Sequence, residues 1–158
     1  MGPHHIYGEG GESVQNWKNE AIRELTLMEQ RRLAAEGLRL RIRWLDNDAV
    51  SLAGGGGNSV PVKGGGNRQE QRLCAFLDKK AELEEEERGL REMVEHTERC
   101  LAGLPERERL VLECFYCRGL ERGSAVCKLE RELYCSRSEV YRIRDRALVK
   151  MALMLGIM

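Results

Sequence analysis

The sequence is poor in aromatic residues, which make up 5% of the chain, and it holds only three prolines. Together with a 33% share of charged residues, this composition is typical of helical proteins and argues against a β-sandwich or a barrel. A net charge is also lacking, because 26 basic side chains balance 26 acidic ones. Attraction of the whole molecule to nucleic acid therefore cannot be assumed, and the placement of charge matters more than its total.

Long apolar runs are missing as well. No segment approaches the roughly 20 apolar residues of a membrane-spanning helix. The first residues, MGPHHIYGEGGES, lack the basic and apolar parts of a signal peptide. The six cysteines then indicate free thiols in a reducing compartment rather than a disulfide framework. We expect a cytoplasmic protein with no membrane partner.

The first 67 residues change in character twice. Residues 1–12 are rich in glycine and are expected to be disordered. Residues 46–67 contain seven glycines in two runs together with Pro61, which predicts a flexible linker. A phosphate-binding loop is not favoured there, because the G-x-x-x-x-G-K-[ST] spacing is missing and no apolar strand precedes the glycines. Between these segments, residues 13–45 predict an amphipathic helix capped by Ser13, with apolar side chains three, four or seven residues apart: Val14, Trp17, Ala21, Leu25, Met28, Ala35, Leu38, Ile42 and Leu45.

Residues 68–103 are expected to form a second long helix. Its apolar side chains lie near a seven-residue repeat: Leu73, Phe76, Leu77, Leu83, Leu90, Val94 and Leu101. Lys80, Glu87 and Thr97 interrupt this seam, so it makes a weak coiled coil taken alone. Two long amphipathic helices joined by a loop can bury their apolar stripes against each other as an antiparallel hairpin, or against a second copy of the chain. We expect the protein to form a homodimer through this hairpin.

The remaining region, residues 104–158, shows the pattern of three shorter helices. Pro105 begins the first of them and Gly119 ends it. A second is expected in SAVCKLERELY and a third, longer one over residues 137–155. The third helix opens on the S-x-x-E pattern of a capping box, formed by Ser136 and Glu139. The expected core positions of the three helices are Leu104, Val111, Leu112, Phe115, Tyr116, Val126, Leu129, Leu133, Val140, Ile143, Ala147 and Met151.

A short helix, a tight turn and a longer helix with a basic side form the helix-turn-helix arrangement. The stretches LPERERLVL and SRSEVYRIRDRAL resemble region 4 of bacterial sigma factors, the part that docks on the −35 promoter element. Over roughly residues 15–155 the chain also resembles the RinA-like and ArpU-like phage regulators of late transcription. These are similar in having a Trp near an EAI, a Gly-rich linker such as VPVKGGGN, and a sigma-region-4-like C-terminus.

This resemblance implies an all-α fold in which a long antiparallel hairpin precedes a helix-turn-helix domain. It also implies action in a bacterial host cell, with double-stranded DNA and RNA polymerase as partners. Two positions depart from the usual motif. Glu130 stands where a small residue is usual, and Tyr134 stands where the turn usually carries Gly. The angle between the two helices is therefore expected to differ from that of the standard motif.

The third helix supplies the candidate DNA-binding residues. An α-helix turns by 100° per residue, so an apolar arc centred on Val140 and Ala147 places the basic side opposite. The N-terminal residues of a recognition helix meet the base edges in the major groove. We expect base or phosphate contacts from Arg137, Ser138 and Arg142, phosphate contacts from Arg146 and Lys150, and a position at the edge of this face for Tyr141. Arg144 falls nearer the apolar arc, where a salt bridge or a snorkelling role is expected.

Catalytic and metal chemistry find little support in the sequence. Cys114 and Cys117 have C-x-x-C spacing, with Cys127 and Cys135 downstream, but a zinc site of four thiolates needs tetrahedral convergence, usually from loops. We therefore expect buried free thiols in preference to zinc or redox chemistry, with no metal and no cofactor. No nucleophile can be paired with a base, so no catalytic residue is expected and the protein is not predicted to be an enzyme.

Two functions follow from these observations. The first is a phage-type, sequence-specific transcription regulator that binds DNA through its helix-turn-helix. The alternative is a helical protein–protein adaptor, for RNA polymerase or a packaging complex, with little direct DNA contact; the zero net charge keeps this alternative open. The sequence gives neither the DNA target nor the direction of regulation.

Overall fold

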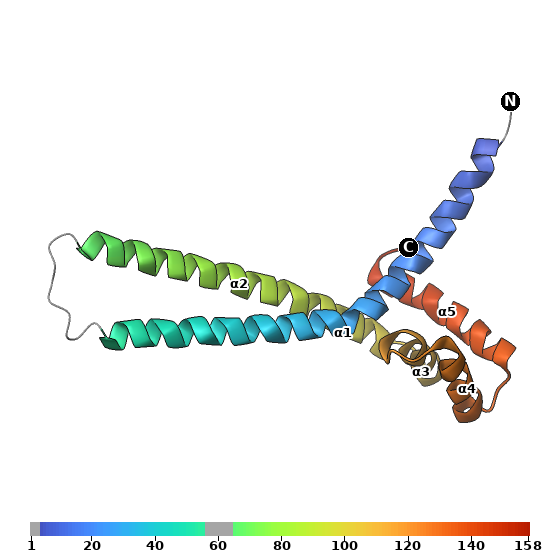
Figure 1. Cartoon of the computed structure of the whole chain (residues 1–158). Helices are drawn as coiled ribbons and strands as arrows, with labels where there is room; N and C mark the ends of the chain where they lie inside the picture. The colour runs from blue at the N-terminus through green and yellow to red at the C-terminus, as the bar shows by residue number, and fades with distance from the viewer. Residues whose placement is uncertain (1–3, 56–64) are drawn as a thin grey trace. The chain divides into compact units, whose positions relative to one another are not determined.

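The computed structural model describes the backbone of residues 4–55 and 65–158 and the side chains of residues 16–50 and 68–158. Its elements are α1 (His4–Gly55), α2 (Gly65–Ala102), α3 (Glu106–Leu112), the π-helical turn η2 (Glu113–Cys117), α4 (Arg122–Leu133) and α5 (Arg137–Leu155) (Figure 1). No strand occurs in the described backbone, and the all-α prediction is confirmed. Within the same residues, no helix has the length and apolar content that crossing a membrane requires.

The first helix is longer at both ends than the predicted helix of residues 13–45. It begins at His4 and ends at Gly55, so it takes in much of the N-terminal segment expected to be disordered and the start of the predicted linker. Ser13 lies inside this helix and is not its N-cap. The residues gained, 4–12 and 46–55, contain no proline, and glycine lowers helix propensity by only about 1 kcal/mol per residue, whereas proline lowers it by about 3 kcal/mol. Residues 1–3 and the centre of the predicted linker, 56–64, lie outside the described residues.

The chain divides into two compact units, of which one consists of residues 31–92. Its segments of α1 and α2 run antiparallel, because rising residue numbers on α1 meet falling numbers on α2. Arg39 Nε lies 2.9 Å from Glu87 Oε1, and Asp46 Oδ1 lies 2.7 Å from Lys80 Nζ. The two charged residues that interrupt the apolar seam of α2 are thus neutralised by partners on α1, which allows Glu87 to be buried at the contact.

The other unit contains residues 93–158 together with residues 1–30, so it is larger than the predicted domain of residues 104–158. One core cluster joins the first part of α1 to the end of α2 and to α5; its buried members include Ala21, Leu25, Met28, Val94, Leu101, Leu112, Ala147, Leu148, Met151 and Ala152. A second cluster joins α3, η2, α4 and α5 through Val111, Cys114, Ala125, Leu129, Val140 and Ile143. The apolar face of α5 contributes side chains to both clusters. Part of α1 therefore helps to bury that face.

Most predicted core positions of this unit are buried. Leu104, Val111, Leu112, Val126, Leu129, Val140, Ile143, Ala147 and Met151 are all inside. Phe115, Tyr116 and Leu133 are half-buried. The first short helix differs from the prediction, because α3 ends at Leu112 and passes into the π-helical turn η2 before Gly119 ends the segment with a φ of +67°.

Candidate nucleic-acid interface

Two residues define the turn between α4 and α5: Tyr134 ends α4, and Ser136 caps the start of α5. Tyr134 closes α4 in the left-handed conformation, at φ 51° and ψ 47°, and its N–H donates to the carbonyl of Glu130. A side chain in this conformation costs roughly 1–2 kcal/mol, which is why Gly is usual there. This cost is local to the backbone of Tyr134, and its side chain, which is 95% exposed, adds no packing clash to it.

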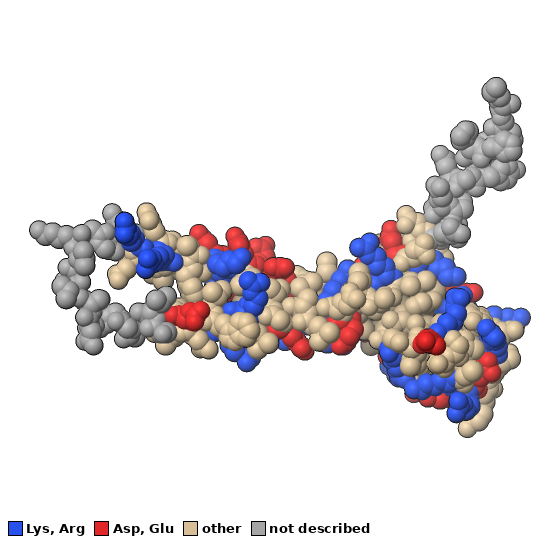
Figure 2. Space-filling model, in the orientation of Figure 1, with Lys and Arg blue, Asp and Glu red and all other residues tan. Residues whose placement is uncertain are grey.

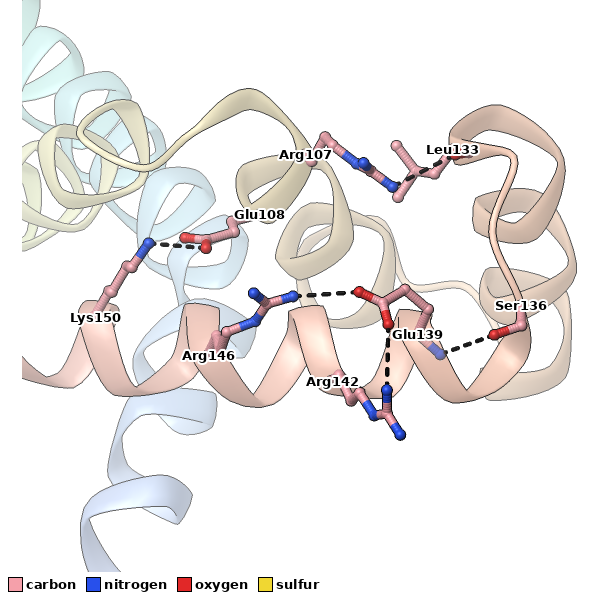
Figure 3. Close-up of polar contacts among 8 residues, drawn as sticks. All are labelled: Arg107, Glu108, Leu133, Ser136, Glu139, Arg142, Arg146 and Lys150. Carbon is pink, nitrogen blue, oxygen red and sulfur yellow. Dashed lines mark hydrogen bonds and ion pairs between the residues drawn. The ribbon is translucent and has the colours of Figure 1, made fainter.

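Ser136 then caps α5. Its Oγ accepts a hydrogen bond from the backbone N–H of Glu139 at 3.2 Å, which confirms the predicted N-cap. The other half of the capping box, in which the Glu139 carboxylate would accept from the N–H of Ser136, is replaced by ion pairs. Glu139 Oε1 lies 3.3 Å from Arg146 Nη2, and Oε2 lies 3.7 Å from Arg142 Nη1 (Figure 3).

The two sides of α5 differ as the sequence predicts. One side is buried through both core clusters, from Val140 to Ala152. On the other side Arg137, Ser138, Arg142 and Arg146 are all exposed, and the side chain of Arg142 is 76% accessible. These four predicted residues therefore share an accessible surface at the N-terminal half of the helix. The carboxylate of Glu139 lies between the guanidinium groups of Arg142 and Arg146.

Lys150 and Tyr141, the other two predicted residues, have structural partners. Lys150 Nζ lies 2.8 Å from Glu108 Oε1 on α3 (Figure 3). The side chain of Glu108 is 12% exposed, so loss of the lysine would leave a largely buried carboxylate without this cation. Arg107 of α3 contacts a different helix, because its Nη2 donates to the carbonyl of Leu133 at the end of α4 at 3.5 Å. The position of α5 against α3 thus depends on a residue expected to contact phosphate.

Tyr141 is half-buried among guanidinium groups. Its ring lies 5.9 Å from that of Phe115, and the Arg144 guanidinium carbon lies 4.9 Å from its centroid. Arg122 of α4 and Arg137 of α5 approach the same ring at 5.9 Å each. Cations over an aromatic face are attracted by the ring quadrupole. The Tyr141 ring therefore keeps guanidinium groups of α4 and α5 close together near the start of α5. Arg122 is a member of this group that the sequence did not indicate.

Arg144 has the salt-bridge role expected of it. Its side chain is 12% exposed, and its Nη2 lies 2.9 Å from Asp145 Oδ1. Lys18 of α1 reaches the same oxygen at 3.3 Å. Burial alone would raise the pKa of Asp145, but the hydrogen bonds and charges of Arg144 and Lys18 outweigh it and hold that pKa below its usual value. Asp145 therefore connects α1 to α5 and leaves Arg144 unavailable to a ligand.

The surface around these residues carries both signs of charge. On the face drawn in Figure 2, the basic side chains of the C-terminal helices are interspersed with acidic ones and form no continuous patch. For residues 136–150, five basic residues (137, 142, 144, 146 and 150) against two acidic ones (139 and 145) give 5 − 2 = +3. Arg144 is mostly buried, and Lys150 is exposed but paired with Glu108 of α3. Arg137, Arg142 and Arg146 are therefore the exposed cations of α5 that no ion pair joins to another helix.

The six cysteines are free thiols. Cys74 and Cys127 are exposed, so the prediction of a buried thiol is wrong for Cys127. Cys114 is buried in the second core cluster, and burial raises the pKa of its thiol. The pair Cys114 and Cys117 lies in the π-helical turn, not within a regular α-helix as expected. Among the residues whose side chains are described, no group of three or more His, Cys, Asp or Glu is arranged to hold a metal ion.

Several of these contacts lie beyond the reach of sequence reasoning. Glu139, Arg142 and Arg146 are spaced i, i+3 and i+7 on one helix, so their proximity was available from the sequence. The contacts of Lys150 with Glu108 and of Lys18 with Asp145 span 42 and 127 residues and had no local signal.

Comparisons of the chain with models of protein families, with curated proteins and with solved structures give no match.

Proposed function

We propose that the protein is a sequence-specific DNA-binding transcription regulator of the phage type, which inserts the N-terminal half of α5 into the major groove. The observation that carries this proposal is the exposed side of α5, where Arg137, Ser138, Arg142 and Arg146 stand together at the capped end of a helix whose other side is buried. A major groove accepts one such helix, and arginine forms bidentate contacts with guanine.

The residues around the start of α5 also support the proposal that this end of the helix faces DNA. The Arg144 guanidinium lies over the Tyr141 ring, and Arg122 adds positive charge from the start of α4. Arg122 is thereby a further candidate for phosphate contact, since the helix before a recognition helix crosses the DNA backbone. The resemblance to sigma region 4 extends the proposal to bacterial RNA polymerase as a protein partner in the host cytoplasm.

A single copy is expected to bind weakly. Three accessible cations on α5 would displace counterions from about three phosphates, which gives a slope of log K against log salt of about −3. Two copies on spaced half-sites would roughly double that slope and would add the affinity of a second recognition helix. Dimerisation is therefore part of the proposed function, as is an operator with two half-sites.

The test is selection of duplexes from a random pool with the full chain, followed by binding titrations on the selected sequence. Arg142→Ala should weaken binding by about 1–3 kcal/mol and relax the preference at one base pair. Arg88→Ala removes the same charge from an exposed position of α2 in the other unit and should leave the affinity unchanged. Equal affinity of Arg142→Ala and Arg88→Ala for every selected duplex would refute the proposed face.

A helical adaptor that binds protein is the second candidate. It is favoured by the ion pairs that occupy Arg142 and Arg146, and by the fully exposed ring of Tyr134, which is not needed for the packing of the unit. The two candidates differ in salt dependence. DNA binding should fall steeply as salt is raised, whereas capture of a protein partner without DNA, insensitive to salt, would support the adaptor.

A further inference from the structure

Within residues 31–92, α1 carries apolar side chains on two opposite sides. Ala35 and Leu38 are buried. Leu33, Leu40 and Trp44 are exposed by 58%, 47% and 62%. At 100° per residue these three lie about 140° to 180° around the helix from Ala35. They form a single outer stripe, which we name the Trp44 stripe.

The Trp44 stripe has the spacing of a coiled-coil seam. Leu33, Gly37, Leu40 and Trp44 follow one another at intervals of four, three and four residues, which places them at alternating d and a positions of a heptad. A Cβ atom added at Gly37 would meet nothing within 4 Å, so the middle of the stripe is open to another chain. Exposed apolar side chains gathered in a row indicate an interaction surface rather than the scatter normal for a monomer.

The charges beside the stripe identify what can occupy it. In this heptad Glu36 and Arg43 take g positions, whereas Arg41 and Asp48 take e positions. When two such helices pair in parallel and in register, each g residue faces the e residue five positions further along the partner. Glu36 then faces Arg41 of a second copy, and Arg43 faces Asp48, so both contacts join opposite charges and each occurs twice.

We propose that the Trp44 stripe is a homodimer seam, in which α1 pairs in parallel with α1 of a second copy. The chain is complementary to itself along this seam, whereas an unrelated partner would have to supply matching charges. An antiparallel pairing brings Glu36 opposite Arg43 and loses the contacts of Arg41 and Asp48. This proposal deepens the dimerisation included in the proposed function, and it identifies the outer face of α1 as the surface responsible.

Sedimentation equilibrium of the full chain without DNA tests the seam. The wild-type protein should be a dimer, and the double substitution Leu40→Glu with Trp44→Glu should raise the dimer dissociation constant more than about a hundredfold, because two large apolar side chains per copy would remain in water. Leu77→Glu, at a residue of α2 that is 53% exposed, is the matched control and should leave the constant unchanged. Circular dichroism should show the same helix content in all three proteins, since the substituted side chains are exposed.

Charge exchange tests the parallel arrangement. Glu36→Arg and Arg41→Glu should each weaken the dimer about tenfold, and the two together should restore it to within about threefold of the wild type. A wild-type monomer, or a dimer that persists in the Leu40→Glu and Trp44→Glu variant, would overturn the seam. Restoration by Arg43→Glu and not by Arg41→Glu would overturn the parallel pairing. These measurements contain no DNA, so failure of DNA binding leaves their outcome intact and is recognised separately.

Discussion

The substitution Glu139→Gln should tighten DNA binding if the proposed face of α5 is correct. The Glu139 carboxylate lies 3.3 Å from Arg146 and 3.7 Å from Arg142, so it competes with phosphate for both guanidinium groups. Two unit charges at such distances attract by about 1 kcal/mol in water. Because both arginines are well exposed, each pair contributes about 0.2–1 kcal/mol after screening and side-chain entropy. Release of both pairs therefore amounts to about 0.4–2 kcal/mol, or about a twofold to thirtyfold gain in affinity.

The same substitution should have a small effect on folding. Gln keeps the backbone N–H that donates to Ser136, so the N-cap stays. Loss of a negative charge from the first turn removes a favourable interaction with the helix dipole, which costs about 0.3–1 kcal/mol. Thermal denaturation followed by circular dichroism measures this cost independently of DNA.

Fluorescence anisotropy with a labelled duplex, titrated at several salt concentrations, is the assay. Glu139→Gln should lower the dissociation constant and make the salt dependence steeper. Glu106→Gln is the matched control, because it makes the same change of charge in the first turn of α3 instead of α5. If Glu139→Gln weakens binding, or if both variants gain equally, the arginines of α5 are not the groups that hold the DNA and the reasoning is refuted.

Three further predictions concern the unit that carries α5. Ser136→Ala removes the acceptor of the α5 cap and should lower the free energy of unfolding by about 1 kcal/mol in urea titrations, whereas Ser138→Ala, at an exposed position without a capping role, should change it by less than about 0.5 kcal/mol. Leu129→Ala removes a fully buried side chain of α4 and should cost about 2–5 kcal/mol in the same titrations. The pKa of Asp145 in the folded protein is below its unfolded value of about 3.9, so its stabilising contribution is present above that pH and is lost as the pH falls through the folded value. Asp145→Asn should therefore reduce the free energy of unfolding at neutral pH, and it should make the decline of that free energy below about pH 4 less steep. Denaturation at a series of pH values measures both effects.

Local signals in the sequence were sufficient for α5. The capping residue Ser136, the spacing of Val140, Ile143, Ala147 and Met151, and the basic positions between them all depend on residues within a few turns of one another. The structure confirms the cap, the buried side and the exposure of Arg142. Helical periodicity is a strong predictor here because burial of one face is the main source of stability for a helix of this length.

The boundaries of the units were not accessible in the same way. Residues 13–45 show one continuous apolar stripe, yet Ala21, Leu25 and Met28 pack in the unit with α5, whereas Ala35 and Leu38 are buried in the unit of residues 31–92. Periodicity shows which side of a helix is covered but carries no information about the element that covers it. The apolar residues Leu33, Leu40 and Trp44 likewise became a distinct outer stripe only when their exposure was known.

The sequence by itself therefore determined an all-α chain, the ends of its most basic helix and the side of that helix that faces the core. These properties follow from hydrogen bonds and contacts between near neighbours. Only the tertiary structure decided that Lys150 pairs with Glu108, that Lys18 meets Asp145, and that α1 contributes to both units. Such contacts join residues far apart in the chain, so they depend on how all the helices pack together and not on any one segment.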